Sequence, residues 1–306
     1  MIEGMTWRRM FRQVRHRFRR RQRTSHLPPE ILSSPWRLFP CATVTKSHVF
    51  AVGDVHGCAR LLEALLSHLS AQSQTDGASC TIVFLGDLID RGPGSIRSLH
   101  LAQSCDANFD RTVILPGNHE GALLKALERP DNKTSFQLWL EKGGEAVVEE
   151  IGAEGLTFSE QLDAVRQALP VGLEDQLRGS PGHVWDGDLL FVHAGITPIG
   201  DRAAFLAQGL HDVKPGLGHW STIRQPFLSW RGGWDSGRTP GPTIVVHGHS
   251  PVVKRGLASL DTIVARADLA ASHARINLDL GSTRSGLIGA LEASGERYRI
   301  HVARQP

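Results

Sequence analysis

Residues 113–124 read VILPGNHEGALL, in which an apolar run meets Gly117-Asn118-His119-Glu120 and then a helical pattern. An amide, an imidazole and a carboxylate therefore stand side by side where a strand is expected to end. A single cluster of this kind is usually an ordinary turn or a helix cap. It becomes informative here because the same arrangement recurs along the chain.

The recurrence begins at His48 and follows one pattern. Short aliphatic or β-branched runs end in glycine or polar clusters, and several lead into helical patterns: HVFAVGDVHG precedes ARLLEALLSHLS, and TIVFLGDLIDRGPG precedes SIRSLHLAQ. Strands that alternate with helices indicate an α/β domain. Helical stretches near 134–152 and 158–170 have no strand between them, so we interpret about 130–170 as a helical insert.

Five polar clusters follow expected strands, namely GDVHG (53–57), GDLIDRG (86–92), GNHE (117–120), HAG (193–195) and HGH (247–249). Loops at the carboxyl ends of strands in an α/β sheet converge, so these clusters should meet. A mixed set of Asp, Asn and His suits Mn, Fe or Zn better than Ca or a pure Mg site.

Two metal ions are expected rather than one. Asp54 and His56 can share one ion, and Asp87 can bridge to a second, which Asn118, His193 and His249 would complete. Two cations about 3.5–4 Å apart bind a hydroxide at neutral pH and hold phosphoryl oxygens for in-line attack. The pattern therefore predicts phosphoester hydrolysis.

In this order, GDVHG, GDLIDRG, GNHE, HAG and HGH resemble the phosphoprotein phosphatase family of binuclear metallophosphoesterases, above all its short bacterial and phage serine/threonine phosphatases. The likeness runs from about His48 to Val302 and includes WLEKGGE, HAGITP, IRQPFL and INLDLGS. One GDxHG would be weak evidence, whereas five motifs in order are a strong signal. The resemblance implies an α/β, calcineurin-like fold: two mixed β-sheets face to face, helices outside, and a binuclear metal site at the strand ends.

The resemblance also implies roles for single residues. One ion is assigned to Asp54, His56 and Asp87, and the other to Asp87, Asn118, His193 and His249. His119 is implied as the general acid for the leaving alkoxide, and Asp90 as the group that orients it, since a carboxylate favours the protonated imidazole. Arg91 is implied as a phosphate clamp, because a planar guanidinium matches two phosphoryl oxygens.

A second arginine precedes the last metal histidine in this family, and two residues compete for that role. Arg224 lies in HWSTIRQPFL, which resembles the bacterial W-I-R-x-P-F-L pattern with an insertion, whereas Arg231 lies in SWRGGW. We prefer Arg224 because more of its neighbours match. Glu120 is interpreted as a hydrogen-bonding support for the two residues before it.

Other features have structural interpretations. His247 is predicted to lie in the core, because strand alternation points it away from His249. Trp139 is likewise predicted to be a core residue. Surface loops at 170–188 and 200–240 are expected to shape a substrate groove, and 285–302 should form a β-hairpin turning at Ser294-Gly295.

The 306 residues, 41% of them hydrophobic, can bury the core of one large domain. The net charge of +3 hides an asymmetry. Residues 1–23 hold nine arginines and one acidic residue. The whole chain has 34 basic and 31 acidic residues, so the rest of the chain has 25 basic and 30 acidic residues. Residues 1–45 are therefore interpreted as a basic arm followed by a proline-rich linker, HLPPEILSSPWRLFP, and 46–306 as the catalytic domain.

Within the arm, apolar residues share one helical stripe: Trp7, Met10, Phe11, Val14 and Phe18. A basic amphipathic helix of this kind suits an anionic membrane surface. A cationic tail that binds polyanions and an organellar targeting peptide are the alternatives. No specific nucleic-acid module is visible, so nucleic-acid binding would be salt-sensitive and non-specific.

The expected location is the cytoplasm, at the membrane periphery if the arm binds there. Four cysteines without C-x-x-C pairing argue against a disulfide framework and a thiolate zinc site. No apolar run approaches the roughly 20 residues that span a bilayer. The arm also lacks the apolar h-region of an export signal.

Three functions are compared. The preferred one is a metal-dependent phosphomonoester hydrolase that acts on phosphoserine and phosphothreonine in proteins. Two Mn²⁺ ions are the expected cofactors, with Fe or Zn as alternatives. A small-molecule phosphatase with the same metal centre stays an open alternative. A bis(5'-nucleosyl)-tetraphosphatase-like hydrolase shares the metal motifs, but those relatives typically lack Asp at the position of Asp90 and carry Asp where Glu120 stands. A catalytically silent membrane adaptor is disfavoured, since all six implied ligands and the acid are present.

Overall fold

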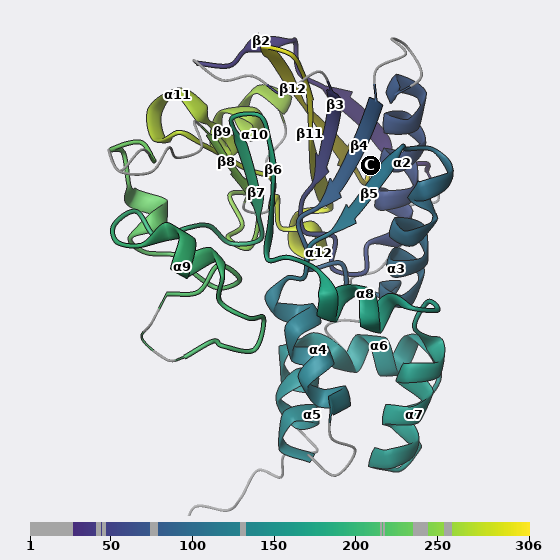
Figure 1. The fold of residues 1–306 in the computed structure, drawn as a ribbon. Coiled ribbons are helices and arrows are strands. Elements are labelled where there is room, and N and C mark those ends of the chain that lie inside the picture. Colours follow the sequence, from purple (N-terminus) through teal and green to yellow (C-terminus); the bar gives the residue numbers. More distant parts are fainter. Residues whose placement is uncertain are drawn as a thin grey trace, which may run out of the picture.

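The computed structural model describes residues 27–40, 44, 47–73, 79–128, 133–214, 216, 218–234, 244–253 and 259–306. Two β-sheets pack face to face, and helices cover the outer side of the larger sheet (Figure 1). The strand orders are β1-β12-β11-β3-β4-β5, with β2 also paired to β12, and β6-β7-β8-β10-β9. This architecture confirms the predicted pair of mixed sheets flanked by helices.

The larger sheet combines parallel and antiparallel pairs. Its strands are β1 (Glu30–Ser33), β2 (Arg37–Leu38), β3 (Ser47–Val52), β4 (Ser79–Phe84), β5 (Arg111–Ile114), β11 (Leu287–Ser294) and β12 (Arg297–Arg304). β3, β4 and β5 run parallel, whereas β11 is antiparallel to both β3 and β12. The hairpin loop is Gly295-Glu296, one residue later than predicted, because Ser294 still pairs with Arg297.

The smaller sheet is built around three parallel strands. Its strands are β6 (His183–Asp186), β7 (Leu189–Val192), β8 (Ile244–His247), β9 (Asp268–Leu269) and β10 (Arg275–Asn277). β7 and β8 are buried along their whole length, as their aliphatic runs require in a parallel sheet covered on both faces. Their carboxyl ends therefore reach the same edge.

Alternation along β3 divides the core into two layers. Val49 and Ala51 pack toward the second sheet, whereas Phe50 and Val52 pack toward α2 (Ala59–Ser73) and α3 (Ser95–Gln103). A short 3-10 turn, η1 (Ser104–Ala107), follows α3. This packing fixes the strand ends that carry the polar clusters.

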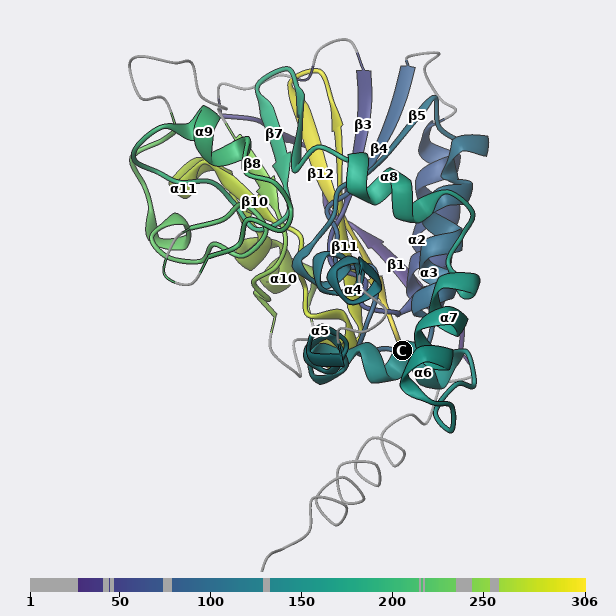
Figure 2. The same ribbon diagram turned by 60° about the horizontal axis from the view of Figure 1, so that its bottom comes forward.

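A group of helices lies together below the larger sheet in Figure 1, and in Figure 2, where the bottom comes forward, part of the group lies in front of the sheet. These elements are α4 (Asn118–Glu128), α5 (Lys133–Trp139), the π-helical η2 (Leu140–Gly144), α6 (Glu145–Glu150), α7 (Phe158–Ala168) and α8 (Leu173–Gly179). Both stretches expected to be helical thus hold helices without a strand between them. Thr157 and Glu160 form a capping box that starts α7.

Three sequence interpretations are corrected by the structure. The proline-rich stretch is not a linker, because β1 pairs with β12 over four residues and β2 adds two more pairs. Residues 170–188 form α8 and β6 rather than a loop. Within 200–240, the described part includes α9 (Arg202–Leu206) and η3 (Phe227–Ser229), and its Trp220, Phe227 and Trp234 are buried in an apolar cluster shared with β7 and β8.

The remaining elements are α10 (Leu260–Ala267), α11 (Ala270–His273) and α12 (Ser282–Ser285). None of the helices in the described ranges has the length and apolar character to cross a membrane. The predicted basic arm, residues 1–23, lies outside the described residues.

Candidate metal centre

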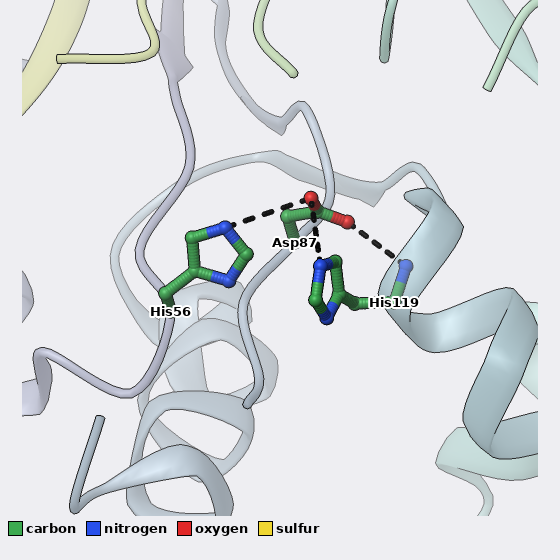
Figure 3. Close-up of side chains that lie close together, drawn as sticks. All are labelled: His56, Asp87 and His119. Carbon is green, nitrogen blue, oxygen red and sulfur yellow. Dashed lines mark hydrogen bonds and ion pairs between the residues drawn. The ribbon is translucent and has the colours of Figure 1, made fainter. Parts of the chain in front are cut away.

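The polar clusters after β3, β4, β5, β7 and β8 meet around Asp87. This carboxylate belongs to two groups whose potential ligand atoms lie within 4.8 Å of one another, one with His56 and His119 and the other with His193 and His249. Figure 3 shows the rings of His56 and His119 side by side, both directed toward Oδ2 of Asp87. Asp87 Oδ2 is 3.7 Å from His56 Nε2, and Oδ1 is 3.5 Å from His193 Nε2.

Asp54 and Asn118, also predicted ligands, adjoin these groups. An oxygen of Asp54 lies 4.0 Å from His56 Nε2, and Asn118 Oδ1 lies 3.3 Å from His193 Nε2. The structure thus gathers all six predicted ligands. The first group contains His119, the predicted acid, in place of Asp54, which was predicted to share an ion with His56 and Asp87. The division of the ligands between two ions stays a prediction.

Hydrogen bonds orient two of the histidines for metal binding. His56 Nδ1 donates to the carbonyl of Ile89 at 2.9 Å, and His193 Nδ1 donates to that of Leu85 at 2.7 Å. Because a carbonyl only accepts, the proton of each neutral ring is on Nδ1 and the lone pair is on Nε2. Nε2 of both rings faces Asp87, as a metal-ligating histidine requires.

Further features fit a bound cation. His249 Nε2 is buried and has no hydrogen-bond partner in the described structure. A Cβ at Gly117 would lie 2.2 Å from Asp87 Oδ1, and one at Gly248 would lie 2.0 Å from Asp54 Oδ1. Two glycines therefore leave room for the carboxylates to reach the centre.

The backbone around the centre is strained. Among the described residues, six non-glycine positions have positive φ, and five of them are here: His56 (46°), Asp87 (53°), Asp90 (72°), Arg91 (69°) and His249 (65°). Such conformations cost on the order of 1–3 kcal/mol each and cluster at functional sites. The strain supports a functional rather than a structural origin for these turns.

Burial and mutual charge shape the ionisation of the carboxylates. Burial opposes ionisation of Asp87, but the surrounding histidines His193, His119, His56 and His249 outweigh it and hold its pKa well below the usual range. Burial and the nearby carboxylates Asp279 and Asp87 raise the pKa of Asp54. Several buried carboxylates close together repel one another, and a divalent cation bound among them would stabilise their ionised form.

Burial lowers the pKa of His56 to about 3 and that of His249 to about 2. These imidazoles are therefore neutral, as ligands must be. His119 differs: burial opposes its charge, but Asp87 and Asp90 raise its pKa. Its Nδ1 donates to Asp90 Oδ2 at 2.6 Å.

The two predicted clamps differ in their surroundings. Arg91 donates to His56 Nε2 at 2.6 Å and to His119 Nε2 at 2.7 Å, so its guanidinium lies within the centre. Burial is the main cause that lowers the pKa of both His193 and His249, and the charge of Arg224 adds to it, so Arg224 lies within electrostatic range of the second group. Arg231 instead donates to His273 at 3.2 Å.

Glu120 supports the site through the backbone of other residues, whereas a hydrogen bond to Asn118 or His119 stays a prediction. It is fully buried, and its carboxylate accepts the backbone N–H groups of Asp87, Leu88 and Gly117 at 2.8–2.9 Å. These bonds join the turns after β4 and β5. Trp139 and His247 are buried as predicted.

Sequence reasoning missed Asp279, a buried residue that follows β10 and interacts with Asp54. Burial raises its pKa to about 7, and the charge of Asp87 adds to this effect. A signal was present: like the other clusters, INLDLGS places a polar residue and a glycine at a strand end.

Two facing mixed sheets with carboxylates and imidazoles gathered at the strand ends define a metal-dependent phosphoesterase. The calcineurin-like phosphoesterase family matches residues 47–273, so the chain belongs to this family and is a hydrolase of the metallophosphoesterase type.

Two curated relatives with different names illustrate the similarity. Serine/threonine-protein phosphatase 1 of Salmonella typhimurium is 36% identical over 133 residues, which are 44% of this chain and 55% of that protein. The symmetrical bis(5'-nucleosyl)-tetraphosphatase of Bordetella pertussis is 31% identical over 163 residues, 53% of this chain and 48% of that protein. The chain thus spans about half the length of these curated relatives. The match to a solved serine/threonine phosphatase from Saccharomyces cerevisiae covers 81% of this chain and 72% of the yeast chain, with 13% sequence identity and a TM-score of 0.46.

Proposed function

We propose that the chain hydrolyses phosphomonoesters, with phosphoserine and phosphothreonine in proteins as its substrates. The observation that carries the proposal is the buried pair of Asp90 and His119, whose 2.6 Å hydrogen bond suits a general acid for an alkoxide leaving group. Dinucleoside polyphosphate hydrolases typically lack this aspartate. The likeness to the Salmonella phosphatase supports the same choice.

The proposed ligands of two divalent ions, Mn²⁺ in our proposal, are Asp54, His56, Asp87, Asn118, His193 and His249. Bound there, the ions would supply positive charge that activates water and neutralises phosphoryl oxygens. The chain's own contribution is the shared carboxylate of Asp87 and neutral imidazoles that face it.

In the proposed reaction His119 gives the leaving group its proton. Asp90 fixes the ring through Nδ1, which leaves Nε2 as the atom that gives up the proton. Arg91 and Arg224 bind the phosphoryl oxygens. Because Arg91 now donates to Nε2 of His119, a phosphate that engages its guanidinium frees this nitrogen to carry a proton.

Phosphate release by metal-stripped protein tests the proposal, with and without added Mn²⁺, on a phosphothreonine peptide and on diadenosine tetraphosphate in parallel. We expect Mn²⁺-dependent release from the peptide and little cleavage of the dinucleotide. Preference for the dinucleotide would overturn the proposal in favour of the second candidate, which the Bordetella relative supports. Full activity without any divalent ion would overturn the metal assignment.

The basic arm has a separate proposed role. Residues 1–23 are proposed to hold the enzyme at an anionic membrane surface in the cytoplasm, on the strength of their nine arginines and the apolar stripe. The catalytic domain is proposed to bring phosphoprotein substrates there.

A further inference from the structure

The helical insert reaches the pair that is proposed to deliver the proton. Trp139, the last residue of α5, is fully buried, and its Nε1–H donates to Asp90 Oδ1 at 3.0 Å. The other oxygen, Oδ2, accepts from His119 Nδ1 at 2.6 Å. One carboxylate is thus held at both ends, by an indole on one side and by the imidazole on the other.

The same segment also holds Arg91. The carbonyl of Gly143 accepts the backbone N–H of Arg91 at 3.0 Å. Gly143 has a φ of 118°, and a Cβ there would lie 2.8 Å from Arg91 Cγ. A Cβ at Gly144 would lie 2.4 Å from the Trp139 ring. The two glycines therefore let the π-helical turn pack against both side chains.

These contacts act on a strained dipeptide. Asp90 and Arg91 are consecutive non-glycine residues with positive φ, a conformation that persists only where several contacts enforce it. The third contact comes from Ser95, whose Oγ accepts the N–H of Asp90 at 2.9 Å. Trp139 alone among these partners holds the carboxylate oxygen that His119 leaves free.

We propose that residues 139–144 of the helical insert are a positioning element for proton transfer and phosphate binding. Trp139 fixes the rotation of the Asp90 carboxylate and, through it, the ring of His119; Gly143 fixes the backbone of Arg91. Trp139 is a positioning residue and does not contact substrate. The inference rests on the proposed role of His119 as the acid.

Trp139→Phe tests this directly, because it removes the indole N–H and keeps an aromatic ring in the core. Trp234→Phe is the matched control: Trp234 is also buried, and its Nε1–H donates to the carbonyl of Ala274. Both variants are compared with the parent protein by thermal unfolding, so that a loss of fold is seen separately.

Two esters separate positioning from general damage. A phosphothreonine peptide has an alkoxide leaving group that must be protonated, whereas p-nitrophenyl phosphate has a leaving group that departs as an anion. For Trp139→Phe we expect kcat on the peptide to fall about tenfold with KM unchanged, and kcat on p-nitrophenyl phosphate to fall less than about threefold. An equal fall on both esters, or the same fall in Trp234→Phe, would show a merely structural role.

A double-mutant cycle asks whether Trp139 acts through Asp90. If it does, adding Trp139→Phe to Asp90→Asn costs little further activity on the peptide. Independent, multiplicative losses would contradict the proposal.

Proton NMR of the metal-free protein gives a readout that needs no turnover. The Nδ1 proton of His119, in a short hydrogen bond to Asp90, should resonate far downfield and be absent from Asp90→Asn. We expect the signal to shift and exchange faster in Trp139→Phe and to stay unchanged in Trp234→Phe. An unchanged signal in Trp139→Phe would overturn the positioning proposal, whereas the expected change without peptide hydrolysis would overturn only the proposed function.

Discussion

At the scale of single residues, Asp87 belongs to both groups of candidate metal ligands. Asp87→Asn keeps the size of the side chain and removes the charge that the surrounding histidines stabilise. We expect loss of bound metal and a fall in hydrolysis of about 100-fold or more. Metal analysis after equilibration with Mn²⁺, together with peptide hydrolysis, measures both. Full hydrolysis in this variant would rule out a binuclear centre on Asp87.

Exposed Asp163 on α7 offers the matched control. Asp163→Asn removes the same charge from the surface of the helical insert, away from every cluster that follows a strand. Metal content and rate should match the parent protein.

The two candidate clamps make an internal comparison. Arg224 interacts electrostatically with His193 and His249, whereas Arg231 donates a hydrogen bond to His273. Since a hydrogen bond to a charged group contributes about 1.5–3 kcal/mol, Arg224→Ala should lower kcat/KM about 10- to 100-fold, and Arg231→Ala should leave it nearly unchanged. The reverse ranking in a steady-state assay would transfer the role to Arg231.

At the scale of secondary-structure elements, Glu292 joins neighbouring strands of the larger sheet. This buried carboxylate of β11 accepts from His48 of β3 at 2.9 Å and from His301 and Arg299 of β12 at 2.6 Å each. Burial opposes its charge, but His301, His48 and Arg299 together hold its pKa far below the ordinary value. The network lies at the opposite end of β3 from the metal centre.

This depressed pKa gives the stability a pH dependence with a definite sign. The ionised carboxylate stabilises the fold fully above about pH 5, and its contribution is lost as the pH falls below the usual glutamate pKa of about 4.3 toward the lower folded value. Glu292→Gln should lower the free energy of unfolding by about 3 kcal/mol at pH 7 and by less at pH 3.

Urea unfolding at several pH values measures this difference. Glu63→Gln is the control, because Glu63 forms a surface pair with Arg97 and both side chains are about half exposed. That change should cost under about 1 kcal/mol. A constant gap between Glu292→Gln and the parent protein from pH 7 to pH 3 would contradict the linkage.

The elements also show where sequence patterns suffice. The β3, β4, β7 and β8 runs are locally apolar and end in glycine or polar residues, so their strands could be read directly. β1 could not, because prolines surround it and its partner β12 is about 270 residues away: Glu30 pairs with Arg304. No local period reveals a strand whose pairing depends on the far end of the chain.

At the scale of the whole molecule, the candidate site could be predicted because its residues sit in short motifs, and the fold brings together the carboxyl ends of strands from both sheets. What the motifs could not show are contacts between motifs. The indole N–H of Trp139 reaches Asp90 from 49 residues away, and Asp279 meets Asp54 only because β10 and β3 end at the same place. Such neighbours depend on the packing of sheets and insert together.

Membrane binding is predicted to depend on residues 1–23, and stability on the strand β1 that follows them. β1 begins at Glu30 and belongs to the larger sheet, so the catalytic fold includes chain well before residue 46. Removing residues 1–23 leaves β1 in place and should abolish binding to anionic vesicles while p-nitrophenyl phosphate hydrolysis and the melting temperature stay unchanged. Removing residues 1–34 also deletes β1 and its four pairs with β12, so the melting temperature should fall by several degrees. Sedimentation with phosphatidylserine vesicles at two salt concentrations tests the first part. Undiminished vesicle binding without residues 1–23 would refute the membrane role of the arm, and equal stability of the two truncations would refute a structural contribution from β1.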